Sequence, residues 1–152
     1  MKKSDKTRQY VIEKAAPVFN TKGYYGTSLH DLTQATGLTK GGIYGNFQNK
    51  DEIALAAYEY NSRQILDRIK TIVLSGKGSA QVLHDITEFY RQYIYNSTLA
   101  GGCPILNTAI EADDTHEGLH RKALASLDYL RRSFIFVIER GMGSGELKQH
   151  LD

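Results

Sequence analysis

Hydroxyl and lysine side chains occupy the predicted starts of successive helices between residues 27 and 50. Thr27 directly precedes one predicted helix, Ser28 and Thr39 each open one, and Lys50 lies in the first turn of another. The first turn of a helix carries backbone N–H groups without intrahelical partners and the positive end of the helix dipole, so it favours an anion. These positions indicate phosphate binding, although plain helix capping explains the hydroxyls of Ser28 and Thr39 equally well.

The distribution of charge also points to an anionic partner. Residues 1–50 hold eight Lys and Arg against three Asp and Glu, whereas the remaining residues hold eleven against fourteen. A basic segment on an otherwise acidic chain favours a polyanion such as nucleic acid. A solvated, lysine-rich N-terminus is the alternative, because Lys2, Lys3 and Lys6 supply part of the excess.

Two further groups of reactive side chains lie in the second half of the chain. Cys103 precedes Pro104 at a predicted helix start, where the dipole favours a thiolate that senses electrophiles or oxidants. The alternative is a small buried hydrophobe with an inert thiol.

His116 and His120 have the i, i+4 spacing of metal ligands and acidic neighbours. We interpret them instead as solvated side chains and predict no metal site.

The second half of the chain is also rich in aromatic residues, with six of the ten tyrosines and three of the five phenylalanines. A tyrosine combines an apolar ring with a polar tip and suits a pocket for a planar or aromatic ligand. Core packing is the alternative for each of them. The candidate ligand-binding residues are Tyr93, Cys103, Asn107, Glu111 and Tyr129.

Several classes of protein are disfavoured. No nucleophile–base pair, phosphate-binding glycine loop or dinucleotide fingerprint is present, so we predict neither an enzyme nor a cofactor. The single cysteine cannot form a disulfide within the chain, which favours a reducing compartment. No apolar run approaches the roughly 20 residues of a membrane-spanning helix, and the N-terminus lacks a signal peptide. We therefore expect a cytoplasmic protein that does not enter a membrane.

Apolar spacing is helical almost throughout and predicts an all-α fold. The first helix carries an apolar stripe from Ile12 to Phe19 and ends at Gly23. Pro17 lies inside this stripe, where it removes a backbone donor, so we expect a kink or a later helix start.

The next two predicted helices form the outline of a helix-turn-helix. The first runs from Ser28 to Gly37, and the second follows Thr39 for about two turns with Ile43 and Phe47 inward. Glycine at the turn tolerates positive φ. In such a unit the second helix enters the major groove of DNA. It would present Lys40, Gly41, Gly42, Tyr44, Gly45 and Asn46.

Longer helices are predicted downstream. A capping box of Asn49 and Glu52 opens a helix that reaches Val73, and residues 75–79 form a linker. Helices are then expected over 80–95, from Pro104, and over 119–138, with breaks at two glycine groups, 101–102 and 141–145. We divide the chain into a helix-turn-helix domain, residues 1–50, and a helical ligand-binding and dimerisation domain, residues 51–152.

Many positions between residues 6 and 55 follow one fixed pattern: Thr27, Ser28, Leu29, Leu32, Ala35, Gly37, Leu38, Thr39, Ile43, Tyr44, Asn46, Phe47, Asn49, Lys50, Asp51, Glu52 and Ile53. This pattern resembles the N-terminal signature of TetR-type transcriptional repressors. The segment from Gly102 to Glu111 is similar to one branch of the family's C-terminal domains. The resemblance implies a three-helix DNA-binding domain joined by a long helix to a C-terminal domain that binds a small molecule.

The resemblance also assigns roles to individual residues. Thr27, Ser28, Thr39, Tyr44 and Lys50 match positions that hold DNA phosphates, while Lys40 and Asn46 match positions that contact base edges or phosphates. Tyr44 is expected to be exposed, with core packing as the alternative. Departures from the family pattern are Thr33 in place of alanine, Pro17, and the glycines of the groove helix, which leave few side chains to discriminate bases.

The function implied is a ligand-responsive repressor that binds a palindromic, double-stranded operator as a homodimer and releases it on binding a small molecule, with aromatic compounds among the candidates. Family members usually continue further and close the dimer with two helices from each subunit. The predicted helix over 119–138 supplies one of them and the chain ends where the other would begin, so the C-terminal domain looks truncated. Two alternatives stay open. One is a regulator that senses oxidants or electrophiles through Cys103, and the other is a helical small-molecule-binding protein without specific DNA binding.

Overall fold

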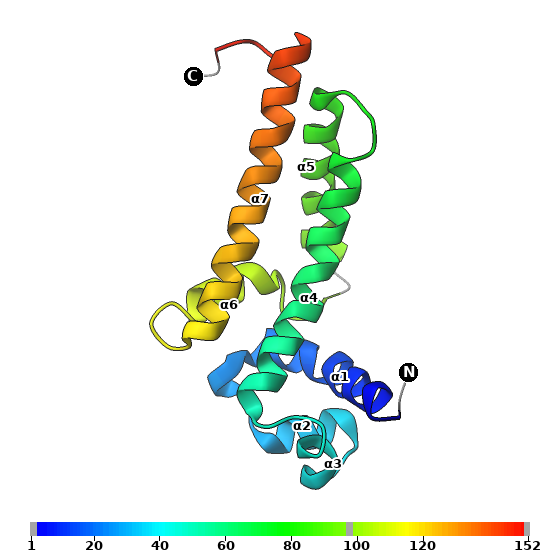
Figure 1. The fold of residues 1–152 in the computed structure, drawn as a ribbon, viewed down its shortest axis with the longest axis vertical. Helices are drawn as coiled ribbons and strands as arrows, with labels where there is room; N and C mark the ends of the chain where they lie inside the picture. Colours follow the sequence, from blue (N-terminus) through cyan, green and yellow to red (C-terminus); the bar gives the residue numbers. More distant parts are fainter. Residues whose placement is uncertain (1–2, 97–98, 151–152) are drawn as a thin grey trace. The chain divides into compact units, whose positions relative to one another are not determined.

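The computed structural model describes residues 3–96 and 99–150, and this part of the chain is all-helical (Figure 1). Its helices are α1 (Lys3–Gly26), α2 (Leu29–Thr36), α3 (Lys40–Tyr44), α4 (Lys50–Val73), α5 (Ser79–Asn96), α6 (Pro104–Glu111) and α7 (Glu117–Ser144). The predicted fold class is confirmed. No helix in the described ranges has the length and apolar character needed to cross a membrane.

The described residues form two compact units. The first contains α1, α2, α3, the beginning of α4, α6 and the beginning of α7; the second contains α5 and the remaining parts of α4 and α7. The boundaries fall after Arg63 in α4 and after Leu124 in α7. Each unit is described by itself below.

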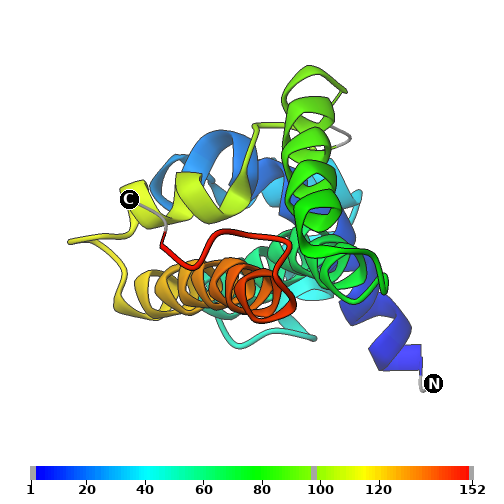
Figure 2. The same cartoon turned by 90° about the horizontal axis from the view of Figure 1, so that it is seen from above.

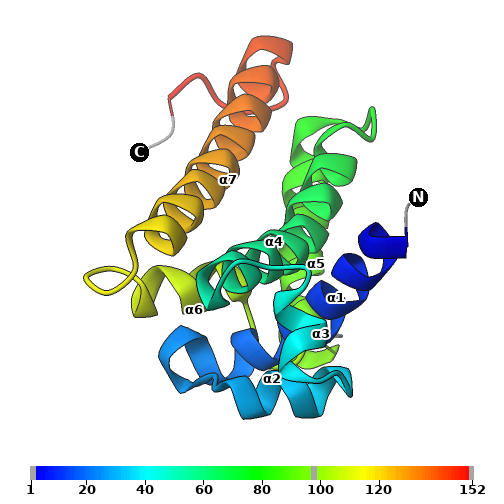
Figure 3. The ribbon, with the colours of Figure 1, turned by 60° about the horizontal axis from the view of Figure 1, so that its bottom comes forward.

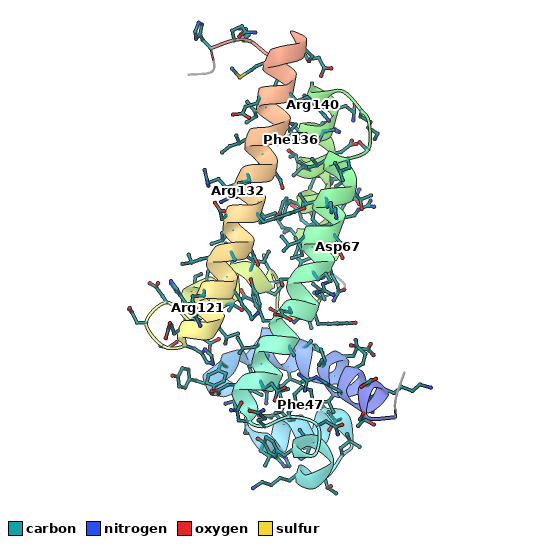
Figure 4. The ribbon with its side chains drawn as sticks, in the orientation of Figure 1. Phe47, Asp67, Arg121, Arg132, Phe136 and Arg140 are labelled. Atoms are coloured by element: carbon teal, nitrogen blue, oxygen red, sulfur yellow. The ribbon has the colours of Figure 1, made fainter. Side chains whose placement is uncertain are left out.

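The core of the first unit lies where α1, α2, α3 and the start of α4 meet (Figure 3). Six side chains are buried there, and they are Val11, Ala15, Leu32, Ile43, Phe47 and Ile53. Phe47 is labelled at this place in Figure 4. Ile12 and Phe19, the ends of the predicted stripe, are partly buried and pack against the same cluster. Burial of such apolar side chains fixes the angle between the short helices, which are too short to be stable alone.

Helix α1 differs from the expectation at Pro17. The helix begins at Lys3, so the later start is wrong, and the only residue of α1 with non-helical backbone angles is Gly23, at φ 73° and ψ 176°. Pro17 is exposed, which lets its ring lie on the solvent side of the helix. The predicted end of the first regular helix at Gly23 is therefore confirmed, and α1 resumes for one short turn after it.

Helix α3 is shorter than predicted, with five residues instead of about two turns. The Gly45 N–H donates to the carbonyls of Gly41 and Ile43, and the Asn46 side-chain amide donates to the Gly42 carbonyl at 2.9 Å. A side chain thus takes the place of the next backbone donor and ends the helix. Phe47 lies beyond α3 but is still buried, as predicted.

The second unit is held together at the start of α5 (Figure 2 shows α4, α5 and α7 from above). Arg140 of α7 donates to the Ser79 hydroxyl at 3.2 Å and to the Lys77 carbonyl at 3.1 Å. Phe136 and Arg140 lie one turn apart on α7 (Figure 4). The Glu146 carboxylate accepts from the backbone N–H groups of Ser79 and Ala80. These contacts satisfy amides that a helix start leaves without partners.

Helix α7 also corrects an expectation, because it continues through Gly141 and Gly143 to Ser144 and stops before Gly145, where φ is 80°. A Cβ on Gly141 would lie 2.6 Å from Leu147 and 2.7 Å from the Ser79 side chain. Gly141 therefore serves close packing inside the helix. Only Gly145 acts as the predicted break.

Candidate nucleic-acid interface

Helix α2 is fixed at its start by a local capping box. The Ser28 hydroxyl accepts from the Asp31 N–H at 3.2 Å, and the Asp31 carboxylate accepts from the Ser28 N–H at 2.8 Å. Lys22 forms an ion pair with the same carboxylate. Hydrogen bonds from Lys22, and then from Ser28, hold the pKa of Asp31 well below its usual range. Capping by Ser28 is thus observed, while its side chain stays exposed beside the first turn.

The turn between α2 and α3 follows the sequence closely. Gly37 ends α2 at φ 69°, and its N–H donates to the Thr33 carbonyl at 2.8 Å. A left-handed conformation of this kind favours glycine. Thr39 then opens α3, and its hydroxyl accepts from the Gly42 N–H at 3.2 Å. The caps and the glycine turn of the helix-turn-helix are therefore formed by contacts between near neighbours.

Thr36 completes the turn, and the sequence analysis did not identify it. Its buried hydroxyl donates to the Leu32 carbonyl at 2.7 Å and accepts from the Leu38 N–H at 3.2 Å. The Tyr10 hydroxyl donates to the Thr36 carbonyl at 3.0 Å. The two bonds of the Thr36 hydroxyl could have been predicted from the sequence, because threonine in a helix commonly donates to the carbonyl four residues back. The Tyr10 bond joins residues 26 apart and has no sequence signal.

The groove helix exposes few side chains. Lys40 and Gly41 are exposed, whereas Tyr44 is half-buried and packs against the core of the first unit. Gly42 lies beside the Thr39 hydroxyl. Asn46 is half-buried, and its side-chain amide is bound to the Gly42 carbonyl. Lys40 and the outer part of the Tyr44 ring are therefore the side chains that α3 offers to a partner.

Thr27 is placed differently from the other hydroxyl residues. It is only 1% exposed, and its hydroxyl donates to the Gly23 carbonyl at 2.6 Å. The side chain thus closes the turn between α1 and α2. Its buried hydroxyl supports the interface from behind, because a contact with phosphate requires an exposed group.

Lys50 begins α4 next to an aromatic side chain. Its ammonium nitrogen lies 4.4 Å from the centroid of the Tyr24 ring, within the range of a cation–π interaction. The Tyr24 hydroxyl donates to the Asp51 carboxylate. Burial, followed by the hydrogen bond to Asp51, raises the pKa of Tyr24 to about 12. Lys50 is consequently held by a neutral ring at the first turn of α4.

Arg8 is a second residue that the sequence analysis did not identify. Its guanidinium donates to the Asn46 carbonyl at 2.6 Å, pairs with Glu52 at 2.7 Å, and lies 4.2 Å from the centroid of the Phe47 ring. It connects α1 to the segment between α3 and α4. The partners are about 40 residues away in sequence, so no local pattern indicates them.

The start of α4 partly confirms the predicted capping box. The Asn49 side chain accepts from the Glu52 N–H at 2.8 Å, as expected. The Glu52 carboxylate accepts from the Gln48 N–H at 2.7 Å, one residue earlier than a standard box. Hydrogen bonding by Gln48 lowers the pKa of Glu52.

The candidate ligand-binding residues are divided between the two units. Tyr93 and Tyr129 belong to the second unit, and Cys103, Asn107 and Glu111 belong to the first. Tyr129 is 39% exposed, and Tyr93 is half-buried 5.9 Å from the Phe89 ring. Cys103 is a half-buried N-cap residue without a side-chain cap.

Asn107 and Glu111 bind the end of α1. The Glu111 carboxylate accepts from the N–H groups of Tyr24 and Tyr25 at 3.0 and 3.2 Å. The Asn107 amide donates to the Gly101 carbonyl at 2.6 Å and lies 3.4 Å from Asn20. Both residues also line an open groove of about 430 Å³ between the end of α1 and α6. A smaller cavity of about 20 Å³ behind Glu111 has room for about one water molecule.

The two histidines near the start of α7 differ from the solvated pair that we expected. The His116 side chain is only 13% exposed, and its ring lies 4.6 Å from the Tyr24 ring. His120 lies 3.4 Å from Asp113 and is 26% exposed. Within residues 3–96 and 99–150, no group of three metal-ligating side chains comes together. His116 therefore belongs to the surroundings of Tyr24.

Two family models match the chain. One, described as bacterial regulatory proteins, tetR family, matches residues 11–57, and the other, described as Tetracyclin repressor-like, C-terminal domain, matches residues 79–152. A crystal structure of a TetR-family transcriptional regulator from Cytophaga hutchinsonii is 41% identical with a TM-score of 0.89, and the match covers 100% of this chain and 76% of that one. The chain belongs to the TetR family of transcriptional regulators.

Two other TetR-type proteins extend this finding. A TetR transcriptional regulator from Chloroflexus aurantiacus is 38% identical with a TM-score of 0.92, over 100% of this chain and 77% of that one. The transcriptional repressor DhaR from Mycobacterium sp. strain GP1 is 24% identical over 147 residues, which are 95% of this chain and 71% of that protein. The chain spans only 55% of the length of other curated relatives. The resemblance stated from the sequence is confirmed.

Proposed function

We propose that this TetR-family protein is a repressor that binds a palindromic operator in double-stranded DNA as a homodimer and releases it when a small molecule binds. We assign DNA binding to residues 1–50 and effector binding and dimerisation to residues 51–152, with the end of α1 also lining the proposed effector groove. The name of DhaR supports repression as the sign of regulation.

The observation that carries the DNA-binding part is the capped helix-turn-helix. Ser28, Thr39 and Lys50 lie at the starts of α2, α3 and α4, each exposed or half-buried. Helix starts favour phosphate, and the second helix of such a unit enters the major groove. Ser28, Thr39, Tyr44 and Lys50 are the proposed phosphate contacts, with Lys40 facing base edges or phosphate. Thr27, Gly42 and Asn46 shape the surface through their bonds and their backbone.

The glycines of the groove helix bear on how bases are read. Gly41 is exposed and a Cβ there would meet no atom closer than 4.0 Å, so its lack of a side chain is not required by packing. A bare helix surface lets the backbone approach the floor of the groove. We therefore expect DNA shape and thymine methyl contacts to contribute to specificity.

The homodimer follows from the operator that we propose. Two groove helices must lie about 34–36 Å apart, one turn of DNA, or a multiple of it, to contact two half-sites. A palindrome is the sequence that a two-fold symmetric protein recognises.

The effector part of the proposal rests on the groove between α1 and α6. Its volume is in the range of small-molecule sites, and Asn107 and Glu111 line it. Because Glu111 also holds the N–H groups of Tyr24 and Tyr25, a ligand that displaces its carboxylate would loosen the end of α1 next to the helix-turn-helix. A ligand shifts DNA affinity only if it binds the two states differently.

Selection from a pool of random duplex DNA at moderate salt, followed by sequencing, tests this proposal. We expect a palindrome and a complex with two protein chains per duplex, measured by light scattering. Sequence-blind or absent binding by the full chain would contradict the DNA-binding part. A single half-site bound by one chain would contradict the dimer while leaving the helix-turn-helix assignment standing.

A further inference from the structure

Tyr24 of α1 contacts three other elements of the first unit. Its ring faces the Lys50 ammonium at the start of α4, and its hydroxyl donates to Asp51. Its backbone N–H donates to Glu111 at the end of α6, and its ring edge meets His116 at the start of α7. No other residue that we have described joins the proposed DNA contact at Lys50 to both α6 and α7.

The contact with Lys50 restricts a flexible side chain. A lysine has four rotatable bonds, and ordering it costs conformational entropy that reduces the affinity for a phosphate. The negative face of the Tyr24 ring, 4.4 Å from the ammonium, favours the rotamers that keep the charge beside α4. Part of the ordering is thereby completed before DNA arrives.

The hydroxyl of Tyr24 fixes the ring in this orientation. It donates to Asp51, which directly follows Lys50 in α4. Because the Asp51 carboxylate accepts this hydrogen bond, it competes less with a DNA phosphate for the Lys50 ammonium. A tyrosine hydroxyl is protonated at physiological pH even at its ordinary pKa of about 10, and burial with the bond to Asp51 raises the pKa of Tyr24 further, to about 12.

The position of Tyr24 depends on residues far away in sequence. The Glu111 carboxylate that holds its N–H is 87 residues away. A Cβ on the preceding residue, Gly23, would lie 2.4 Å from that carboxylate, so the two segments are in close contact. The His116 ring, edge-on at 79°, blocks the side of the Tyr24 ring. A shift of α6 or of the start of α7 therefore moves the ring on which Lys50 rests.

We propose that Tyr24 is a positioning residue that orders the Lys50 side chain for a DNA phosphate and makes that contact depend on α6 and α7. The inference rests on the proposed function of Lys50 as a phosphate contact. The inference assigns a role in DNA binding to a residue that does not contact DNA itself. Contacts with Glu111, Asp51 and His116 fix the position of this residue.

A double-mutant cycle with the selected operator tests the proposal. Tyr24→Leu, which removes the ring, should weaken binding about three- to fivefold in the wild-type background, the range of an exposed cation–π contact. The same change should have almost no effect in a Lys50→Ala background, because the positioned group is already absent. Tyr24→Phe keeps the ring and should retain most of the affinity.

A second measurement needs no DNA. In proton NMR of the free protein, the ring current of Tyr24 should shift the Lys50 ε-methylene signal upfield in the wild type and in Tyr24→Phe. Tyr24→Leu should abolish this shift. Loss of the shift in Glu111→Gln as well would show that α6 controls the ring, and thermal unfolding confirms that each variant is folded.

Three results would overturn the inference. Equal weakening by Tyr24→Leu in both backgrounds would indicate a purely structural role. An unshifted Lys50 signal in the wild type would show that the side chain is not held on the ring. Unchanged affinity in Lys50→Ala would remove the contact that Tyr24 is said to position, whereas absence of any DNA binding by the wild type identifies failure of the proposed function itself.

Discussion

Residues 27–50 and the segments around α5, α6 and α7 are organised by contacts of different range. In the first region the helix caps join near neighbours: Ser28 to Asp31, Thr39 to Gly42, and Asn49 to Glu52. Tyr10 and Arg8 of α1 add bonds to this region from 26 and 38 residues away. In the second region Glu111 binds Tyr24 across 87 residues, and Glu146 binds Ser79 across 67. We therefore expect substitutions in the first region to act mainly on DNA affinity, and substitutions at the long-range contacts to act mainly on the stability of each unit and on the position of Tyr24 beside Lys50.

The largest change in stability is expected at Gly23, which has a positive φ and packs directly against the Glu111 carboxylate. Gly23→Ala forces an alanine into φ 73°, ψ 176° and brings its Cβ to 2.4 Å from Glu111. The variant should lose about 3 kcal/mol of unfolding free energy, measured by urea titration. Gly143→Ala, in the last turn of α7 with open space around the added Cβ, is the control and should change the free energy of unfolding by no more than about 0.5 kcal/mol. Similar losses in both variants would contradict the account.

The next effect concerns DNA affinity in the local region. Lys50→Ala should weaken operator binding roughly five- to tenfold and make the slope of log affinity against log salt shallower by about one unit. Lys70→Ala, an exposed lysine of the same helix in the second unit, is the matched control and should change neither value. An unchanged slope for Lys50→Ala would remove it from the phosphate contacts.

A smaller change in stability is expected from the α2 cap. Ser28→Ala removes the hydroxyl that accepts from the Asp31 N–H and should cost about 1 kcal/mol of stability. Ser28→Asp keeps a capping acceptor but places a negative charge beside the proposed phosphate. Because the Ser28 hydroxyl also donates to the Asp31 carboxylate at 2.7 Å, the new charge repels Asp31 too, so this variant should lose stability much as Ser28→Ala does. It should bind DNA more weakly than Ser28→Ala, which separates the contact role of Ser28 from its capping role. Equal DNA affinity for wild type and Ser28→Asp would leave capping as its only role.

The smallest effect is a pH dependence at the same cap. Lys22 and Ser28 hold the pKa of Asp31 below its usual value, so its contribution to stability is complete above the unfolded pKa of about 3.9 and is lost as pH falls toward the folded pKa. Asp31→Asn should be less stable than the wild type at pH 7, and the difference should shrink below about pH 4. Lys22→Ala should show the same trend in urea titrations. A difference as large at pH 2 as at pH 7 would contradict this, since most of the loss occurs as the pH approaches the lowered pKa of Asp31 in the folded protein.

The helix-turn-helix was largely predictable from the sequence because its signals are local. The caps at Ser28 and Thr39 and the turn at Gly37 depend on residues within four positions, and each is observed as predicted. The length of α3 was not predictable from apolar spacing alone. Its end depends on the Asn46 side chain donating to Gly42, and apolar periodicity carries no information about such a bond.

The roles of the second region were much less predictable. Asn107 and Glu111 were chosen as ligand-binding candidates for their chemical type, and the structure shows both of them bound to the end of α1 or its neighbours. His116 was expected in solvent but lies against Tyr24. Apart from the bond between Asn107 and Gly101, which are six residues apart, the partners in these contacts are 86 to 92 residues away, so only the folded structure brings them together.

Amide hydrogen exchange of the full chain with and without the selected operator tests the central claim most directly. The account predicts that DNA slows exchange in α2, α3 and the first turn of α4, within residues 27–53, and leaves α5 and residues 125–144 of α7 unchanged. Protection centred on α5 or α7, or no protection within residues 27–53, would contradict the assignment of the DNA contact to the helix-turn-helix.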